Sequence, residues 1–90
     1  MTDENRTAEE RLLDNGYEDV VIFRDPGFDE ALVGVSTDNR AVYDYEKMVA
    51  CLMKTGITYD EAVDWIECDT LRAAGYLGEV APIVFDRLIL

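Results

Sequence analysis

The sequence predicts a single α+β domain of two layers, in which an antiparallel sheet of three to four strands carries about three helices on one face. Three observations support this class. A chain of 90 residues has room for one hydrophobic core, so residues 1–90 form one domain. Short runs of β-forming residues are separated by turn signals. Two Thr-x-x-Glu patterns mark helix starts. The expected order of elements is α-β-β-β-α-α-β.

The first expected helix follows residues 1–6, which are polar and expected to be disordered. Thr7 and Glu10 have the spacing of a capping box, in which each side chain accepts a hydrogen bond from the other residue's backbone. The pair Leu12-Leu13 supplies the apolar face. Gly16 stands where a left-handed residue commonly ends a helix.

Three strands are expected next. The run Val20–Phe23 is continuously apolar, which is typical of a strand buried on both faces. Asp25-Pro26-Gly27 predicts a turn after it. Segments 30–36 and 41–43 flank a short polar loop, which is the signature of a hairpin. Gly34 stands alone in the first of these two, where a bulge or a close backbone contact is the ordinary explanation.

Two helices and a final strand are expected in the second half. Asp44 is placed to cap the first helix. Thr58 and Glu61 form a second capping box, and the helix that follows should run over residues 59–74. The last strand is expected over residues 83–85, and its apolar pattern continues to Leu90. The inner faces of the two helices are expected to carry Met48, Val49, Cys51 and Leu52, then Ala62, Val63, Ile66, Thr70 and Ala73.

Charge is the strongest single feature of the sequence. The chain has 20 acidic and 8 basic residues and no histidine, for a formal net charge of −12. So much charge on a small body creates a potential of several kT at its surface, which repels nucleic acid and anionic membranes and attracts basic proteins. We therefore expect no direct binding to nucleic acid or membrane. The expected partner is a protein with a basic surface. Solubility is the simpler explanation of the same charge.

The sequence lacks the residues that enzymes and metal sites most often use. Without histidine there is no Ser-His or Cys-His pair, and Cys51 and Cys68 alone do not form a zinc site. Both cysteines lie in apolar helical stretches, so we expect two buried free thiols in a reducing cytoplasm. The polar N-terminus and the lack of an apolar run of ~20 residues agree with that location. We expect no cofactor and no enzymatic activity. Carboxylates that hold a divalent metal are the least favoured alternative.

The candidate partner-binding residues combine acids with aromatic rings. Asp60, Asp64 and Glu67 should share the outer face of one helix, with Glu61 beside them, although such acids also simply complement a helix dipole. Tyrosine and tryptophan are frequent both in interface cores and at core edges. Rings mixed with acids suit a basic groove, because arginine stacks on rings and pairs with carboxylates. The candidate set is Asp60, Glu61, Asp64, Glu67, Tyr45, Tyr59, Trp65 and Tyr76.

Five segments in the second half of the chain form a recognisable pattern: Ala41–Tyr45, Lys47–Val49, Tyr59–Ile66, Thr70–Ala73 and Ala81–Val84. In this pattern, which covers about half of the chain, the sequence resembles small uncharacterised acidic proteins from bacterial and phage genomes. In size and acidity the chain is also similar to phage-encoded inhibitors, including anti-CRISPR and anti-restriction proteins. That resemblance implies an inhibitor that mimics the charge of DNA and occupies a basic nucleic-acid-binding surface of its partner, which would be a nuclease or another nucleic-acid-binding complex. The alternative is an intracellular adaptor or a homo-oligomeric structural domain that uses its Tyr/Trp surface.

Overall fold

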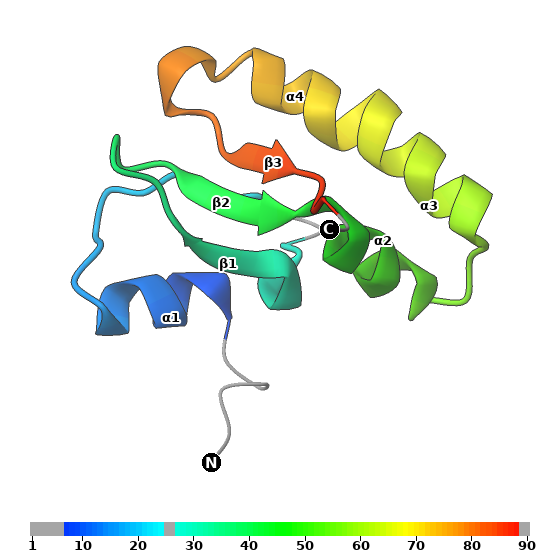
Figure 1. Ribbon diagram of the computed structural model, residues 1–90, viewed down its shortest axis with the longest axis horizontal. Coiled ribbons are helices and arrows are strands. Elements are labelled where there is room, and N and C mark those ends of the chain that lie inside the picture. The colour runs from blue at the N-terminus through cyan, green and yellow to red at the C-terminus, as the bar shows by residue number, and fades with distance from the viewer. Residues whose placement is uncertain (1–6, 25–26, 89–90) are drawn as a thin grey trace.

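The computed structural model describes residues 7–24 and 27–88 and has an α+β fold (Figure 1). In this part of the chain, three consecutive helical segments over residues 59–75 join into one long helix. This long helix and the helices over residues 8–14 and 45–53 accompany three strands. Expectations for residues 1–6, for the turn at 25–26 and for a strand at 89–90 lie outside the described residues. The elements in order are α1 (Ala8–Asp14), a 3-10 turn (Asp29–Ala31), β1 (Leu32–Val35), β2 (Ala41–Asp44), α2 (Tyr45–Met53), α3 (Tyr59–Trp65), the π-helical segment (Ile66–Thr70), α4 (Leu71–Gly75), a second 3-10 turn (Gly78–Val80) and β3 (Ile83–Phe85).

The sheet is mixed, with β2 at its centre and the strand order β1-β2-β3. β1 and β2 form the predicted antiparallel hairpin, in which Val35 pairs with Ala41. β3 instead runs parallel to β2, with Val42 opposite Ile83, so the prediction of a wholly antiparallel sheet is wrong. Parallel neighbours need a long crossover connection. Here α2 and the long helix supply it.

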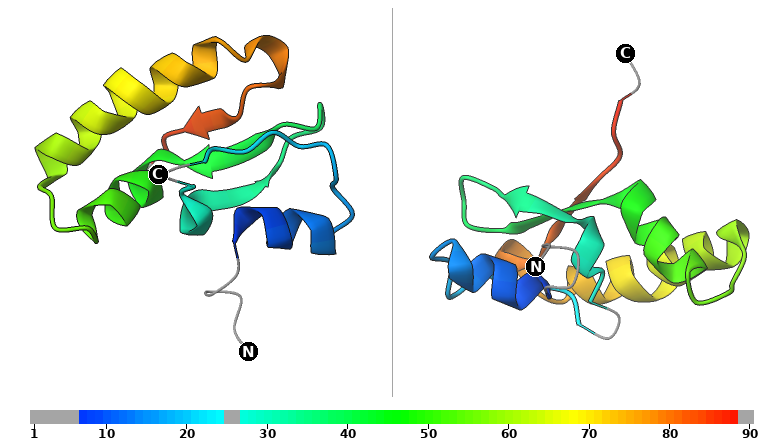
Figure 2. Two further views of the ribbon diagram at one scale, coloured as in Figure 1. Left: turned by 180° about the vertical axis from the view of Figure 1, so that it is seen from behind. Right: turned by 90° about the horizontal axis from the view of Figure 1, so that it is seen from below.

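The helices α1, α3 and α4 lie on the same side of the sheet (Figure 2). Leu32, Ala41 and Tyr43 are buried on this side. Val33 is 43% exposed, and Val42 is half-buried. The core therefore sits between the sheet and the helices. None of the helices in the described ranges is long and apolar enough to cross a membrane.

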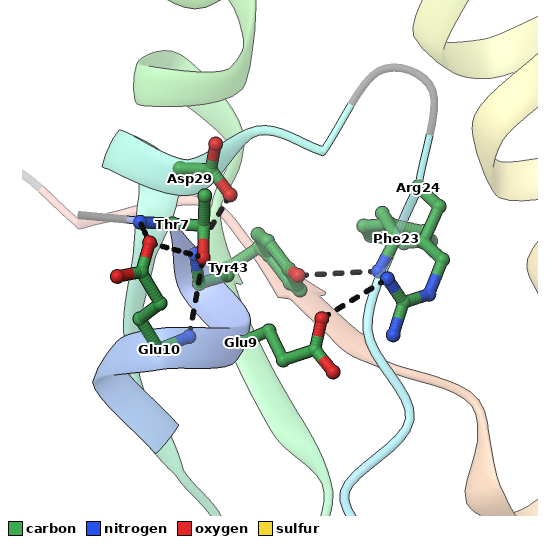
Figure 3. Close-up of polar contacts among 8 residues, drawn as sticks. Thr7, Glu9, Glu10, Phe23, Arg24, Asp29 and Tyr43 are labelled. Atoms are coloured by element: carbon green, nitrogen blue, oxygen red, sulfur yellow. Dashed lines mark hydrogen bonds and ion pairs between the residues drawn. The ribbon is translucent and has the colours of Figure 1, made fainter. Parts of the chain in front are cut away.

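The predicted strand at Val20–Phe23 is wrong, because this segment is irregular. Its apolar side chains still reach the core. The Phe23 ring lies 4.7 Å from the Tyr43 ring and meets the Phe28 ring edge-on at 6.0 Å. The Phe23 N–H donates to the Tyr43 hydroxyl at 3.2 Å (Figure 3). The Tyr43 side chain of β2 thus gives this segment a hydrogen-bond acceptor and an apolar contact. In a regular sheet, a neighbouring strand would supply both.

The predicted helix starts are confirmed by their capping bonds. The Thr7 side chain accepts from the Glu10 N–H at 3.2 Å, and the Glu10 carboxylate accepts from the Thr7 N–H at 3.2 Å (Figure 3). Thr58 and Glu61 form the same reciprocal pair at 3.2 and 3.0 Å. Asp44 caps α2. These bonds satisfy backbone N–H groups that have no partner inside the helix.

Two details of the predicted helix faces need correction. In α1, Leu13 is 52% exposed, and the buried face consists of Leu12 and Ala8. In the long helix, Thr70 is buried as predicted, but Ala74 is buried in place of Ala73. The π-helical segment over residues 66–70 explains the shift, because its i→i+5 bonds place one more residue in a turn.

Candidate functional site

Three acids form a line on the outer surface of the long helix. Asp60, Asp64 and Glu67, here called the acidic stripe, are four and three residues apart, and such residues are neighbours on a helix surface. All three side chains are exposed. Ala62 and Ile66, on the opposite side of the helix, are fully buried. The buried residues anchor the helix to the core, so the positions of the three acids relative to the fold are fixed.

The acidic stripe has no cation to neutralise it within the part of the chain that the structure describes. None of its carboxylates takes part in an ion pair there. The sequence has no Lys or Arg between Lys54 and Arg72, and Asp69 is a further exposed acid on the same long helix. Glu30, by contrast, has a partner, because its carboxylate lies 2.5 Å from the Lys54 ammonium. The charge of the stripe remains available to a cationic partner.

Glu61 has a structural role that separates it from the stripe. Its carboxylate accepts the Thr58 backbone N–H at 3.0 Å and completes the capping box of α3. Hydrogen bonding to the Thr58 backbone, and then to the Thr58 side chain, lowers the pKa of Glu61 below its ordinary value. A partner would have to compete with this cap for the carboxylate.

The predicted aromatic residues of the long helix do not form one cluster. Tyr59 immediately precedes Asp60, and Trp65 immediately follows Asp64, so the two rings flank the acidic stripe on opposite sides. They are 57% and 45% exposed. Tyr76 follows the end of α4, roughly 16 Å along the helix axis from Trp65 at 1.5 Å per residue, and it is 82% exposed. Trp65 is therefore a half-covered surface residue and not a core residue.

Tyr45 lies closer to the charge of the stripe than its place in the sequence suggests. It is the first residue of α2, is half-buried, and packs against the core. Burial, followed by the negative charges of Glu67 and Asp86, raises the pKa of Tyr45. Tyr45 of α2 is therefore near enough to Glu67 of the long helix and to Asp86 after β3 for both charges to act on its phenol.

The two cysteines have different surroundings. Cys51 is half-buried in α2, and burial, followed by the charge of Glu30, raises the pKa of its thiol. Cys68 is exposed, so the expectation that both thiols are buried is wrong. Cys68 follows Glu67 on the outer side of the helix, and the apolar neighbours in its sequence face the core instead. Both cysteines are free.

The acids of the stripe are spread along the helix and do not converge. Among the residues that the structure describes, no three His, Cys, Asp or Glu side chains are grouped so that they could hold a metal ion. The geometry instead suits contacts along an extended cationic surface.

A groove between α1 and β1 is a feature that the sequence reasoning missed. It has a volume of about 300 Å³ and is lined by Arg11, Leu12 and Tyr17 on one side and by residues 32–35 of β1 on the other. The pairing of β1 with β2 is irregular between Leu32 and Gly34, so the expected bulge is present. No atom lies within 4 Å of a Cβ built on Gly34, which excludes the alternative of a close contact.

Comparison with known proteins identifies no relative. No protein-family model matches the sequence. No curated protein matches it significantly, and neither does any solved structure. The function is therefore inferred from the residues and geometry of the chain itself.

Proposed function

We propose that this protein is a non-enzymatic acidic binding protein that occupies a basic, nucleic-acid-binding surface of a protein partner. The observation that carries the proposal is the acidic stripe: three exposed carboxylates on a rigid helix without a neutralising cation. Similarity in size and acidity to phage-encoded anti-CRISPR and anti-restriction inhibitors supports the same role. The proposed setting is a reducing cytoplasm, in which Cys51 and Cys68 remain thiols.

Mimicry of DNA requires more charge than one helix provides. Neighbouring acids of the stripe are about 4.5–6 Å apart along the helix axis at 1.5 Å per residue, whereas B-DNA carries one negative charge per about 1.7 Å of its axis. Asp86 is a further exposed acid near the stripe, because its charge and that of Glu67 both act on the Tyr45 phenol. We propose that Asp86 and the acidic stripe together form the surface that replaces phosphates in the partner's basic channel.

Neutralisation of the stripe tests this proposal. One variant carries Asp60→Asn, Asp64→Asn and Glu67→Gln. A control carries Glu18→Gln, Asp19→Asn and Glu79→Gln, which changes the net charge equally at exposed acids away from the long helix. Tagged forms of both are used to capture partners from nuclease-treated host lysate, and the affinity for the purified partner is then measured at low and high salt.

We expect the stripe variant to lose about tenfold or more in affinity for a partner that high salt releases. The control should keep its binding. Equal losses in the two variants would mean that only net charge matters. Unchanged binding by a correctly folded stripe variant would contradict the proposal.

A second candidate function is favoured by the exposed aromatic rings. Trp65 and Tyr76 remain 45% and 82% exposed, although such rings supply much of the energy of protein interfaces. An adaptor or homo-oligomeric domain that used them would bind through apolar contacts, so its affinity would tolerate salt. Light scattering of the protein and of a Trp65→Ala, Tyr76→Ala variant distinguishes the two. An assembly that persists at high salt and disappears in this variant favours the second function.

A further inference from the structure

An ion pair joins the segment after β3 to the start of α2. The Arg87 Nε lies 2.9 Å from Oδ2 of Asp44, and its Nη2 lies 3.7 Å from Oε2 of Glu46. The Asp44 side chain is 2% exposed, whereas that of Arg87 is 57% exposed. The other Asp44 oxygen, Oδ1, accepts the Lys47 N–H at 3.3 Å and caps α2. Asp44 is therefore a buried, fixed anchor for the Arg87 guanidinium.

This anchor acts where the pairing of the strands ends. The last pair between β2 and β3 consists of Asp44 and Phe85. Asp86 and Arg87 follow outside any strand. Asp86 thus stands between Phe85, which the sheet holds, and Arg87, which the ion pair holds. The two attachments together limit how far the Asp86 backbone can move.

Asp86 lies beside the acidic stripe because of this arrangement. Since Asp44 pairs with Phe85, the residues that follow them, Tyr45 and Asp86, leave the sheet close together. The Asp86 side chain is exposed. Burial, followed by the charges of Glu67 and Asp86, raises the pKa of Tyr45, which agrees with that position. Asp86 therefore extends the stripe only while the segment after β3 keeps its place.

We propose that Arg87 is a positioning residue whose ion pair with Asp44 holds Asp86 beside the acidic stripe, within the surface that a basic partner contacts. Charge alone would give Arg87 the opposite role, because an exposed cation repels a cationic partner. The role in binding rests on the proposed function, whereas the positioning can be measured without a partner.

The test compares the effect of Asp86→Asn in three backgrounds: the unaltered chain, Arg87→Met and Arg72→Met. Arg72→Met is the matched control, because it removes an exposed cation for which the described residues show no ion pair. Two residues that act through one another show effects that do not add. Arg87→Gln replaces Arg87→Met if that variant does not fold, since its shorter side chain reaches Asp44 only if the segment moves.

The first measurement needs no partner. Nuclear magnetic resonance titration of the Tyr45 ring gives its pKa, and circular dichroism checks the fold over the same pH range. We expect Asp86→Asn to lower the pKa of Tyr45 in the unaltered chain and in Arg72→Met, because a negative charge near the phenol is lost. In Arg87→Met the same substitution should change this pKa little, because Asp86 has already moved away.

The second measurement uses a capped peptide of eight arginines as the probe of a basic surface, with calorimetry at low salt. Asp86→Asn should weaken peptide binding about threefold in the unaltered chain and in Arg72→Met, which is typical of one exposed charge. It should have little effect in Arg87→Met.

Two outcomes would overturn the proposal. Equal effects of Asp86→Asn on the Tyr45 pKa in all three backgrounds would show that Asp86 keeps its place without Arg87. Tighter peptide binding by Arg87→Met, with the full effect of Asp86→Asn retained, would show that Arg87 acts only as a cation. If instead the stripe variant keeps its affinity for a partner, the proposed function fails while the coupling measured at Tyr45 still stands.

Discussion

The Tyr43 hydroxyl accepts a hydrogen bond from the backbone N–H of Phe23 at 3.2 Å, and both residues are buried. Tyr43 belongs to the central strand, whereas Phe23 belongs to an irregular segment that is not a strand of the described sheet. The two rings also pack against each other in a tilted arrangement, with centroids 4.7 Å apart. One side chain therefore gives this segment both an apolar contact and a partner for its backbone.

Tyr43→Phe should lower the free energy of unfolding by about 1–3 kcal/mol. The ring stays in place, but the buried N–H of Phe23 loses its acceptor, and that loss has a cost of this size. Urea denaturation measures the change. Tyr76→Phe is the matched control, because its side chain is 82% exposed, and it should alter stability by less than about 0.5 kcal/mol. Equal stability of the two variants would contradict the role given to the Tyr43 hydroxyl.

Ionisation of Tyr43 should lower the free energy of unfolding at alkaline pH. Burial raises the pKa of Tyr43 from its ordinary value of 10.0 to about 12. Since the folded pKa is the higher one, the neutral phenol stabilises the fold fully below pH 10, and this contribution is lost as pH rises from about 10 to about 12. Urea midpoints across this range measure the decline. The decline should be shallower in Tyr43→Phe, and an equally steep one would assign it to other groups.

Arg87→Met should destabilise the protein by about 1–2 kcal/mol. The Asp44 carboxylate is 2% exposed, and one of its oxygens lies 2.9 Å from the Arg87 guanidinium. Loss of a partner from a fully buried pair costs about 3–5 kcal/mol, and the figure here is smaller because the Arg87 side chain is 57% exposed. Thermal unfolding measures the effect. Arg72→Met removes an exposed cation without a described ion pair, and a similar loss in that control would refute the importance of the pair.

Trp65→Ala should leave the protein folded. Its side chain is 45% exposed, so the loss should stay below the about 3–5 kcal/mol expected for a buried tryptophan. The neighbouring Ile66 is fully buried, and Ile66→Ala should cost about 2–5 kcal/mol. Circular dichroism and urea denaturation compare the two variants. A larger loss for Trp65→Ala than for Ile66→Ala would place Trp65 in the core.

Features that depend on neighbours in the sequence could be predicted well. The capping boxes at Thr7 and Thr58 need only residues three positions apart, and the hairpin of β1 and β2 needs only a short loop. The acidic stripe was predictable for the same reason, since helical spacing alone aligns Asp60, Asp64 and Glu67. The absence of Lys and Arg between positions 54 and 72 also indicated that the helix itself supplies no cation to neutralise the acidic stripe.

Features that depend on distant residues could not be predicted in this way. An apolar run such as Val20–Phe23 shows that it will be buried, but not whether a strand or the ring of Tyr43 will cover it. The direction of β3 depends on a crossover of two helices. The groove is built by α1 and β1, whose contact between Arg11 and Leu32 joins residues 21 positions apart.

The parallel pairing of β2 and β3 sets the order in which the sheet can form. Val35 and Ala41 meet across a short hairpin, whereas the pairing of Val42 with Ile83 closes a loop that contains α2 and the long helix. Closing a longer loop costs more entropy and slows folding. During synthesis, β2 therefore keeps one bare edge until the residues after α4 have been made, and a bare edge can pair with another nascent copy. Mutual repulsion between chains of net charge −12 opposes that pairing, so the acidity also protects an unfinished molecule from aggregation.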